Sequence, residues 1–390
     1  MHGTIDDLSD PEVTMRHLAG RTIATIVSLI LCHSLLLLAA DLFVDSGQRL
    51  GNEASWGIAL GDIDSDGDYD AVIANNLEPA FVWLNDGSGQ FTDSGQRLSA
   101  GSTPVAQLAD FDGDGHLDIL FGLGDDPAVV WWNRGNGIFD EGPTLQAIRD
   151  CIALDVGDVT GDGIPDIVSG NNGANVVLRS NGNRTFTQLQ RLGNTQSGGI
   201  ELADMDGDGD LDIVDAGWMA PSYVWRNSGR GTFSRLFEFD TSGDIIHGVV
   251  AADLEGDGDA DVFLAANRFE PGGSVWINDG TGDLTPAPYG LGGIFQNGIV
   301  SGDFNGDGHL DIAISSGNPQ ELDPSKIFLG DGAAFDQPPI EFSQGYSGKI
   351  ATADLDLDGD LDLFVTYLAQ SGAGPYRPRP NEVWLNTTND

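Results

Sequence analysis

Short apolar runs alternate with short polar stretches through residues 42–390 of this chain. In the first unit of the pattern, residues 56–62 and 71–75 flank an acidic stretch, and two further extended runs follow at 81–85 and 90–98. Runs of this length, bounded by Gly, Asn and Asp, are typical of strands and turns rather than helices. The pattern therefore predicts an all-β protein.

The acidic stretch between the first two strands has the pattern of a calcium loop. In residues 204–212, Asp stands at positions 1, 3, 5 and 9, and glycine stands at position 6. Oxygen ligands at alternate positions converge on one Ca²⁺ at about 2.3–2.6 Å when the backbone turns sharply, and glycine permits that turn. The carbonyl group of position 7 offers a further oxygen.

This loop recurs seven times, with starts at residues 62, 110, 158, 204, 253, 303 and 354, and position 6 is glycine in every copy. A fixed period indicates an array of repeated units. We therefore predict up to seven structural Ca²⁺ ions. Their ligands would be Asp62, Asp64, Asp66, Asp68, Asp70, Asp110, Asp112, Asp114, His116, Asp118, Asp158, Thr160, Asp162, Ile164, Asp166, Asp204, Asp206, Asp208, Asp210, Asp212, Asp253, Glu255, Asp257, Asp259, Asp261, Asp303, Asn305, Asp307, His309, Asp311, Asp354, Asp356, Asp358, Asp360 and Asp362.

An EF-hand is the alternative interpretation of such a loop, and it requires a Glu at position 12 with a helix on each side. Position 12 is never Glu here, and the flanking residues have strand composition. Each repeat adds a third strand, a Gly/Asn turn and a fourth strand. Four antiparallel strands per period predict a propeller blade, and seven periods predict a seven-bladed β-propeller over residues 41–390.

The two ends of this region predict how the ring closes. Residues 42–50 nearly duplicate residues 91–98, which form a fourth strand, whereas the seventh repeat stops after its third strand at 381–386. We expect the N-terminal strand to complete the last blade. The third strands carry aromatic residues, which we expect to pack between blades rather than to bind sugar. These are Trp83, Trp131, Trp132, Trp225, Trp276, Phe328 and Trp384.

Residues 1–40 have the features of an export signal, with a basic start near Arg16, an apolar middle and small residues before Asp41. Met15 is a candidate for the true start. An uncleaved membrane anchor remains an alternative, because the apolar run is long enough to span a bilayer. Cys151 is the one cysteine after this segment, so no disulfide can form within residues 41–390. We therefore expect calcium rather than a disulfide to stabilise the fold of a secreted or surface-exposed protein.

The formal net charge of −44 makes nucleic acid an unfavourable partner. Much of this charge has an explanation, because 26 of the 61 acidic residues stand at ligand positions of the loops. A membrane would be a partner only through an uncleaved N-terminal segment.

The loops at 110–118 and 303–311 make the chain resemble the FG-GAP or VCBS repeats of bacterial exported proteins and, more distantly, the N-terminal propeller of integrin α chains. The resemblance covers residues 42–390. It implies a calcium-bearing seven-bladed propeller that serves in adhesion or in binding glycans and proteins. Similar repeats also occur in some polysaccharide lyases.

The connections between second and third strands vary most, and variable loops on a rigid scaffold commonly carry binding. They leave the blades on the face opposite the calcium loops. The ligand-binding candidates on this face are His247, Trp218, Arg268, Tyr376, Arg377 and Arg379. We expect a binding module for glycan or protein. The alternative is a lyase acting on an acidic glycan, in which His247, Tyr376 and Arg377 would supply the chemistry.

Overall fold

The computed structural model describes residues 42–98, 102, 105–241, 243–266, 273–292, 296–317, 323–368 and 379–389. The predicted export segment at 1–40 lies outside these residues. Residues Val44–Asp390 form one compact unit, whose described parts contain strands and no helix. In the part of the chain that is described, no helix is both long and apolar enough to cross a membrane.

The first fifteen strands are β1 (Phe43–Asp45), β2 (Ser55–Gly61), β3 (Asp70–Asn75), β4 (Ala80–Leu84), β5 (Thr92–Leu98), β6 (Val105–Ala109), β7 (Asp118–Gly122), β8 (Ala128–Asn133), β9 (Phe139–Leu145), β10 (Cys151–Gly157), β11 (Asp166–Ser180), β12 (Phe186–Ala203), β13 (Asp212–Gly217), β14 (Ser222–Asn227) and β15 (Phe233–Phe239). The remaining strands are β16 (Ile246–Ala252), β17 (Asp261–Ala266), β18 (Gly273–Asn278), β19 (Leu284–Leu291), β20 (Gln296–Gly302), β21 (Asp311–Ser316), β22 (Pro324–Phe328), β23 (Ile340–Gln344), β24 (Ser347–Ala353), β25 (Asp362–Tyr367) and β26 (Glu382–Asn386).

These strands form a propeller of antiparallel blades, as predicted, but the prediction of seven separate blades is wrong. The described strands make six sheets, of which five have four strands and one has six. The six-stranded sheet, β10 to β15, holds the third and fourth repeats together. In it, β11 changes partner from β10 to β12 after Asn171, and β12 changes partner from β11 to β13 after Gln196. The chain turns back at 172–174, where Oγ of Ser169 donates to the carbonyl oxygen of Val176 at 3.4 Å. The two repeats share one sheet because β12 continues without a break from the third repeat into the fourth.

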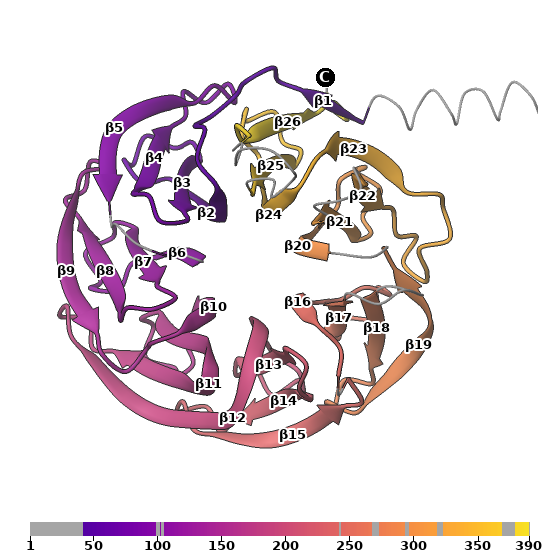
Figure 1. Ribbon diagram of the computed structural model, residues 1–390. Coiled ribbons are helices and arrows are strands. Elements are labelled where there is room, and N and C mark those ends of the chain that lie inside the picture. Colours follow the sequence, from indigo (N-terminus) through magenta and orange to yellow (C-terminus); the bar gives the residue numbers. More distant parts are fainter. Residues whose placement is uncertain are drawn as a thin grey trace, which may run out of the picture. The chain divides into compact units, whose positions relative to one another are not determined.

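The first strand of each repeat lies on the inside, and these seven strands contact one another in sequence. The order is β2, β6, β10, the second half of β12, β16, β20 and β24, and β24 then contacts β2 (Figure 1). The acidic loops join these inner strands to the second strands. Antiparallel pairing therefore places all the loops at one end of the inner strands and the connections between second and third strands at the other.

The predicted closure between the two ends of the chain is confirmed. β1 joins β26 as the fourth strand of the sheet β1-β26-β25-β24. The N–H of Ser46 donates to the carbonyl oxygen of Val383 at 3.0 Å, and Leu50 and Asn381 exchange two backbone hydrogen bonds of 3.0 and 3.1 Å. The side chain of Gln48 extends this contact to the next sheet, where it donates to the carbonyl oxygen of Gly89 and accepts from the N–H of Phe91.

The hydrophobic core lies between neighbouring sheets. One cluster combines Val72 and Val82 of the first sheet with Ile119 and Phe121 of the next, all of them buried. The aromatic residues of the third strands contribute to these clusters, or to an edge-to-face ring pair in the case of Trp384 with Phe342. Their predicted role in packing between blades is therefore confirmed for the described residues.

Candidate metal loops and central channel

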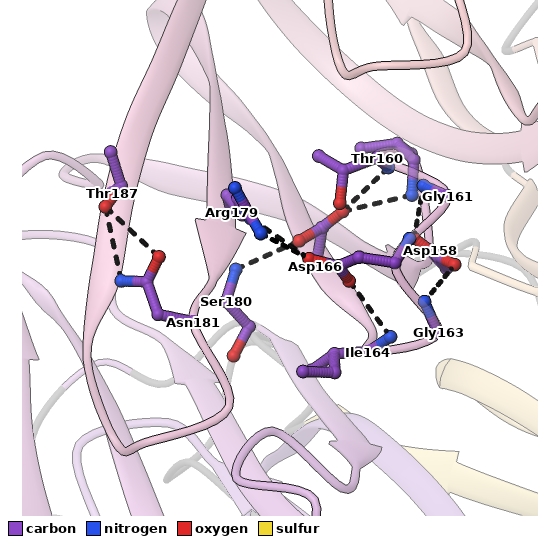
Figure 2. A network of polar contacts seen from close by, with 12 residues as sticks. Asp158, Thr160, Gly161, Gly163, Ile164, Asp166, Arg179, Ser180, Asn181 and Thr187 are labelled. Carbon is purple, nitrogen blue, oxygen red and sulfur yellow. Dashed lines mark hydrogen bonds and ion pairs between the residues drawn. The ribbon is translucent and has the colours of Figure 1, made fainter.

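The first Asp of each loop fixes the shape of the loop backbone. In the third loop, the carboxylate of Asp158 accepts hydrogen bonds from the N–H groups of Asp162 and Gly163 at 3.1 and 2.7 Å (Figure 2). Gly163 has a φ of +86°, which a residue with a side chain rarely adopts. The same two bonds, from positions 5 and 6 to position 1, occur in all seven loops.

The Asp at position 9 anchors each loop to its own blade. In the third loop, Asp166 accepts from the N–H of Val159 at 3.1 Å and from the N–H of Ser180, at the end of the third strand, at 2.9 Å. Equivalent bonds form in every loop, and all seven position-9 residues are buried. Burial raises the pKa of these carboxyls to about 7 in Asp70, Asp118 and Asp362, and to about 6 in Asp166, Asp212 and Asp311.

Carboxylate oxygens converge in four of the loops. In each of these loops, one oxygen from each of three Asp side chains lies within 4.8 Å of the other two. The triads are Asp62, Asp64 and Asp66; Asp110, Asp112 and Asp118; Asp204, Asp206 and Asp212; and Asp354, Asp356 and Asp362. The remaining loops have Thr160, Glu255 and Asn305 at position 3. The convergent triads are the arrangement that a hard cation with oxygen ligands requires.

Buried oxygen atoms at position 3 fit the same ligand class. Oδ1 of Asp64 and Oδ1 of Asp206 are buried and have no hydrogen-bond partner among the described residues. A buried carboxylate oxygen without a partner is energetically costly. Burial and the charge of a neighbouring Asp raise the pKa of both carboxyls. A cation bound between these oxygens would give each buried oxygen a partner and would offset the repulsion between neighbouring carboxylates. It would therefore favour the charged form of both carboxyls.

Three loops have arginine side chains against their carboxylates. Nε of Arg184 lies 2.6 Å from Oδ2 of Asp112, and Nε of Arg226 lies 2.6 Å from Oδ2 of Asp206. Arg179 pairs with Asp162, at position 5 of the third loop, at 2.7 Å. These arginine side chains neutralise part of the negative charge of the loops, which the sequence pattern led us to expect Ca²⁺ to balance. The ion pairs were not predicted from the spacing of the acidic residues.

The side chains at position 7 lie against the hairpin turn of the same repeat. A Cβ atom at Gly135 would be 2.6 Å from the ring of His116, and one at Gly332 would be 2.5 Å from the ring of His309. Likewise, a Cβ atom at Gly182 would be 2.6 Å from Cδ1 of Ile164. The predicted calcium contact of these residues runs through the backbone carbonyl and stays a prediction.

The polar side chains that connect each loop to the next blade were not predicted from the sequence. Nδ2 of Asn133, at the end of β8, donates to the carbonyl oxygen of Ile63 in the preceding loop at 2.7 Å. The same contact between blades is made by Asn85, Ser180, Asn227, Asn278 and Asn386. The sixth repeat has Gly330 at this position, where a Cβ would be 2.2 Å from the carbonyl oxygen of Leu310. The recurrence of Asn after the third-strand aromatic was the available signal.

The inner strands enclose a cavity of about 190 Å³. Three ionisable residues line it: Glu201 on β12, His247 on β16 and Lys349 on β24. Nζ of Lys349 donates to the carbonyl oxygen of His247 at 3.2 Å. Burial lowers the pKa of Lys349 to about 8 and, together with the charge of Lys349, lowers the pKa of His247 to about 4.

The structure brings two of the predicted ligand-binding residues together. The rings of Trp218 and His247 lie 4.4 Å apart, edge to face, at the end of the inner strands that is opposite the loops. Arg379 lies elsewhere, stacked 4.3 Å from the ring centroid of Tyr367 and paired with the buried Glu382 at 2.5 Å. The predicted residues Arg268, Tyr376 and Arg377 lie outside the described residues.

Comparison with protein families finds one model in five successive copies. Residues 62–121, 110–169, 158–214, 216–264 and 256–314 match the model described as an FG-GAP-like repeat. The first match starts at the first acidic loop, and together the matches span six of the seven loops. A search of curated protein sequences found no match.

Solved structures with a similar fold have low sequence identity. A structure of an Agrocybe aegerita lectin that recognises non-reducing terminal N-acetylglucosamine has a TM-score of 0.53 at 22% identity, over 77% of this chain and 83% of the lectin. BBS1N, in a complex with ARL6DN, has a TM-score of 0.59 at 12% identity, over 90% of this chain and 99% of that one. Raptor of Chaetomium thermophilum scores 0.60 at 12% identity, over 91% of this chain but 30% of Raptor. These similarities show the fold.

Proposed function

The chain belongs to the FG-GAP-like repeat family, and from that premise we propose that it is a secreted or surface-exposed, calcium-loaded propeller that binds a glycan or a protein. The loops supply the scaffold and the opposite end of the ring supplies the binding surface. Binding of this kind requires no covalent step.

Calcium is proposed as the cation because the ligand atoms offered are carboxylate and carbonyl oxygens. Hard oxygen ligands suit Ca²⁺ and Mg²⁺, and the larger ion tolerates the flexible, highly coordinated geometry of an acidic loop. The buried Oδ1 atoms of Asp64 and Asp206 support this choice, because a bound cation would give each of them a partner. Metal binding of this kind contributes directly to the free energy of folding.

The observation that carries the binding function is the pair formed by Trp218 and His247. Two rings at 4.4 Å combine an apolar face with polar ring nitrogens, a combination that suits the faces and hydroxyl groups of a sugar. The pair stands where the repeats differ in sequence, whereas the loop end is nearly identical in each repeat. The likeness to a lectin makes glycan the first ligand class to test.

A glycan array in the presence of calcium tests this function. We expect binding that falls strongly in Trp218→Ala and is unchanged in Tyr69→Ala, which removes an exposed ring at the loop end. Binding that survives Trp218→Ala would contradict the proposed site. A rise in ultraviolet absorbance on incubation with a uronate-containing polysaccharide would favour the lyase over the binding module.

A further inference from the structure

Lys349 occupies a position that other repeats leave without a side chain. It stands five residues before the first Asp of its loop, and the corresponding residues of four other repeats are Gly57, Gly199, Gly248 and Gly298. Lys349 and the first three of these glycines line the cavity between the inner strands. The glycines leave room in the channel, and the seventh repeat places its lysine against that space.

The ammonium group of Lys349 has no carboxylate partner within ion-pair distance among the described residues. It donates a hydrogen bond to the carbonyl oxygen of His247, which leaves two of its three N–H donors for other acceptors. With a pKa of about 8, Lys349 remains largely protonated at pH 7. It is one of only two lysines in the chain, the other being Lys326.

The remaining titratable groups at the channel do not neutralise this charge directly. Burial and the charge of Asp155 raise the pKa of Glu201 well above its usual range, which favours the protonated form of this carboxyl group. Asp155 accepts hydrogen bonds from the N–H groups of Val156 and Leu202, both at 2.8 Å. His247 is neutral at pH 7 because its pKa lies near 4.

We propose that this channel binds a single acidic monosaccharide, whose carboxylate pairs with Lys349, whose hydroxyl groups contact the carboxyl group of Glu201, and whose ring lies toward Trp218 and His247. This inference rests on the proposed function and specifies the ligand class of the same surface. Charge-assisted hydrogen bonds to a carboxylate are the strongest polar contacts that a lysine makes.

The size of the cavity favours one sugar unit over a polymer segment. Its volume of about 190 Å³ is below the roughly 300–1,000 Å³ of sites that enclose drug-sized ligands. A terminal residue or a free monosaccharide therefore fits better than an internal stretch of chain.

Isothermal titration of the calcium-loaded full chain with sodium D-glucuronate tests the proposal, with D-glucose as the neutral probe. We expect binding of glucuronate but not of glucose. Lys349→Met should weaken binding by about 10- to 100-fold, which is the usual effect of losing a hydrogen bond to a charged group. Lys326→Met, which removes the second lysine, is the matched control and should bind as the unmodified chain does. Affinity should fall as the pH rises above about 8, because Lys349 then loses its proton.

Two further measurements keep the test decisive. Melting curves should show that Lys349→Met folds, because the change removes a buried charge and keeps a side chain of similar length. Glu201→Gln provides a second variant, with a loss smaller than that of Lys349→Met. Equal affinity for glucuronate and glucose, or unchanged binding in Lys349→Met, would overturn the inference. If a neutral glycan still bound in a Trp218-dependent way, the proposed function would stand without it.

Discussion

The two ends of the inner strands differ in how they use the repeated sequence. At the loop end, all seven repeats have the same bonds from positions 1 and 9, so the local structure is made seven times over. At the opposite end and in the channel, the important residues occur once each: Trp218, His247 and Lys349. The repeated residues therefore build the scaffold, and the residues that occur in one repeat each form the candidate site.

Calcium removal should have the largest effect and should separate the two ends. A ligand that binds only the folded state stabilises it by about 2.7 kcal/mol per site when its free concentration is 100 times its Kd. With several loops filled, chelation with EGTA should lower the melting temperature by tens of degrees, as measured by calorimetry.

Lys349→Met should show the same drop on chelation, because its side chain contacts no loop. A melting temperature that stays constant after exhaustive chelation would contradict the role of calcium in the scaffold.

The pH dependence of stability should differ between the metal-free and the loaded protein. Six of the seven buried position-9 carboxyls have pKa values of about 6 to 7 when folded, above the value of 3.8 expected when unfolded, and burial also raises the pKa of the seventh, Asp261. The folded state therefore binds more protons, and the metal-free protein should lose stability as the pH rises from about 4 to about 7.

Bound calcium favours the charged carboxylates and should abolish this loss. Urea unfolding at pH 4.5, 5.5 and 6.5, with EGTA or with calcium, measures the difference. Parallel pH profiles in the two conditions would argue against cation binding at these carboxylates.

Asn133→Ala should weaken one contact between blades. It leaves the buried carbonyl oxygen of Ile63 without its donor, which costs about 1–3 kcal/mol. Urea unfolding of the calcium-loaded chain measures this loss. Asn52→Ala, at an exposed position, is the control and should change the free energy of unfolding by less than about 0.5 kcal/mol. A loss no larger than that of the control would show that the amide contact is dispensable.

Arg226→Ala should have the smallest effect and sharpens the comparison among the loops themselves. Its guanidinium group pairs with Asp206 and Asp208, and it competes with a cation for the same oxygens. Calcium affinity of the fourth loop should therefore rise, by a few-fold at most, because exposed ion pairs contribute little. Calcium titration followed by calorimetry measures the change, and Arg230→Ala in the adjacent turn should leave it unaltered. A fall in affinity would mean that Arg226 supports the site.

The loop end could be predicted from sequence because its determinants are local. Nine consecutive residues specify each loop, and the glycine at position 6 can be recognised without knowledge of the fold. The number of sheets could not be predicted in this way. Whether β12 ends with the third repeat or continues into the fourth depends on its pairing with β11 up to Gln196 and with β13 from Ser197, and these are tertiary contacts.

The channel was harder to predict, because its residues come from different repeats. Glu201, His247 and Lys349 lie far apart in sequence and meet only when the inner strands form a ring. His247 was a candidate because it is the one histidine outside the loops and the N-terminal segment, and Trp218 because it stands in a variable connection between second and third strands. Lys349 interrupts the repeat, since four other repeats have glycine at its position, but a single lysine in a strand suggested no chemistry by itself.

The pairing of β1 with β26 has a consequence for how the protein is made. Leu50 and Asn381 bond across more than 300 residues, so synthesis of nearly the whole chain precedes their meeting. Until then, the edge of β26 offers free N–H and C=O groups, which form a template for another strand. A second copy of the chain could supply residues 42–50 in place of the molecule's own, and two molecules would then exchange their first strands. The near-duplicate at 91–98 is a second candidate for the same edge. Correct assembly therefore depends on the tethered strand arriving first, which the high local concentration of a segment in the same chain favours.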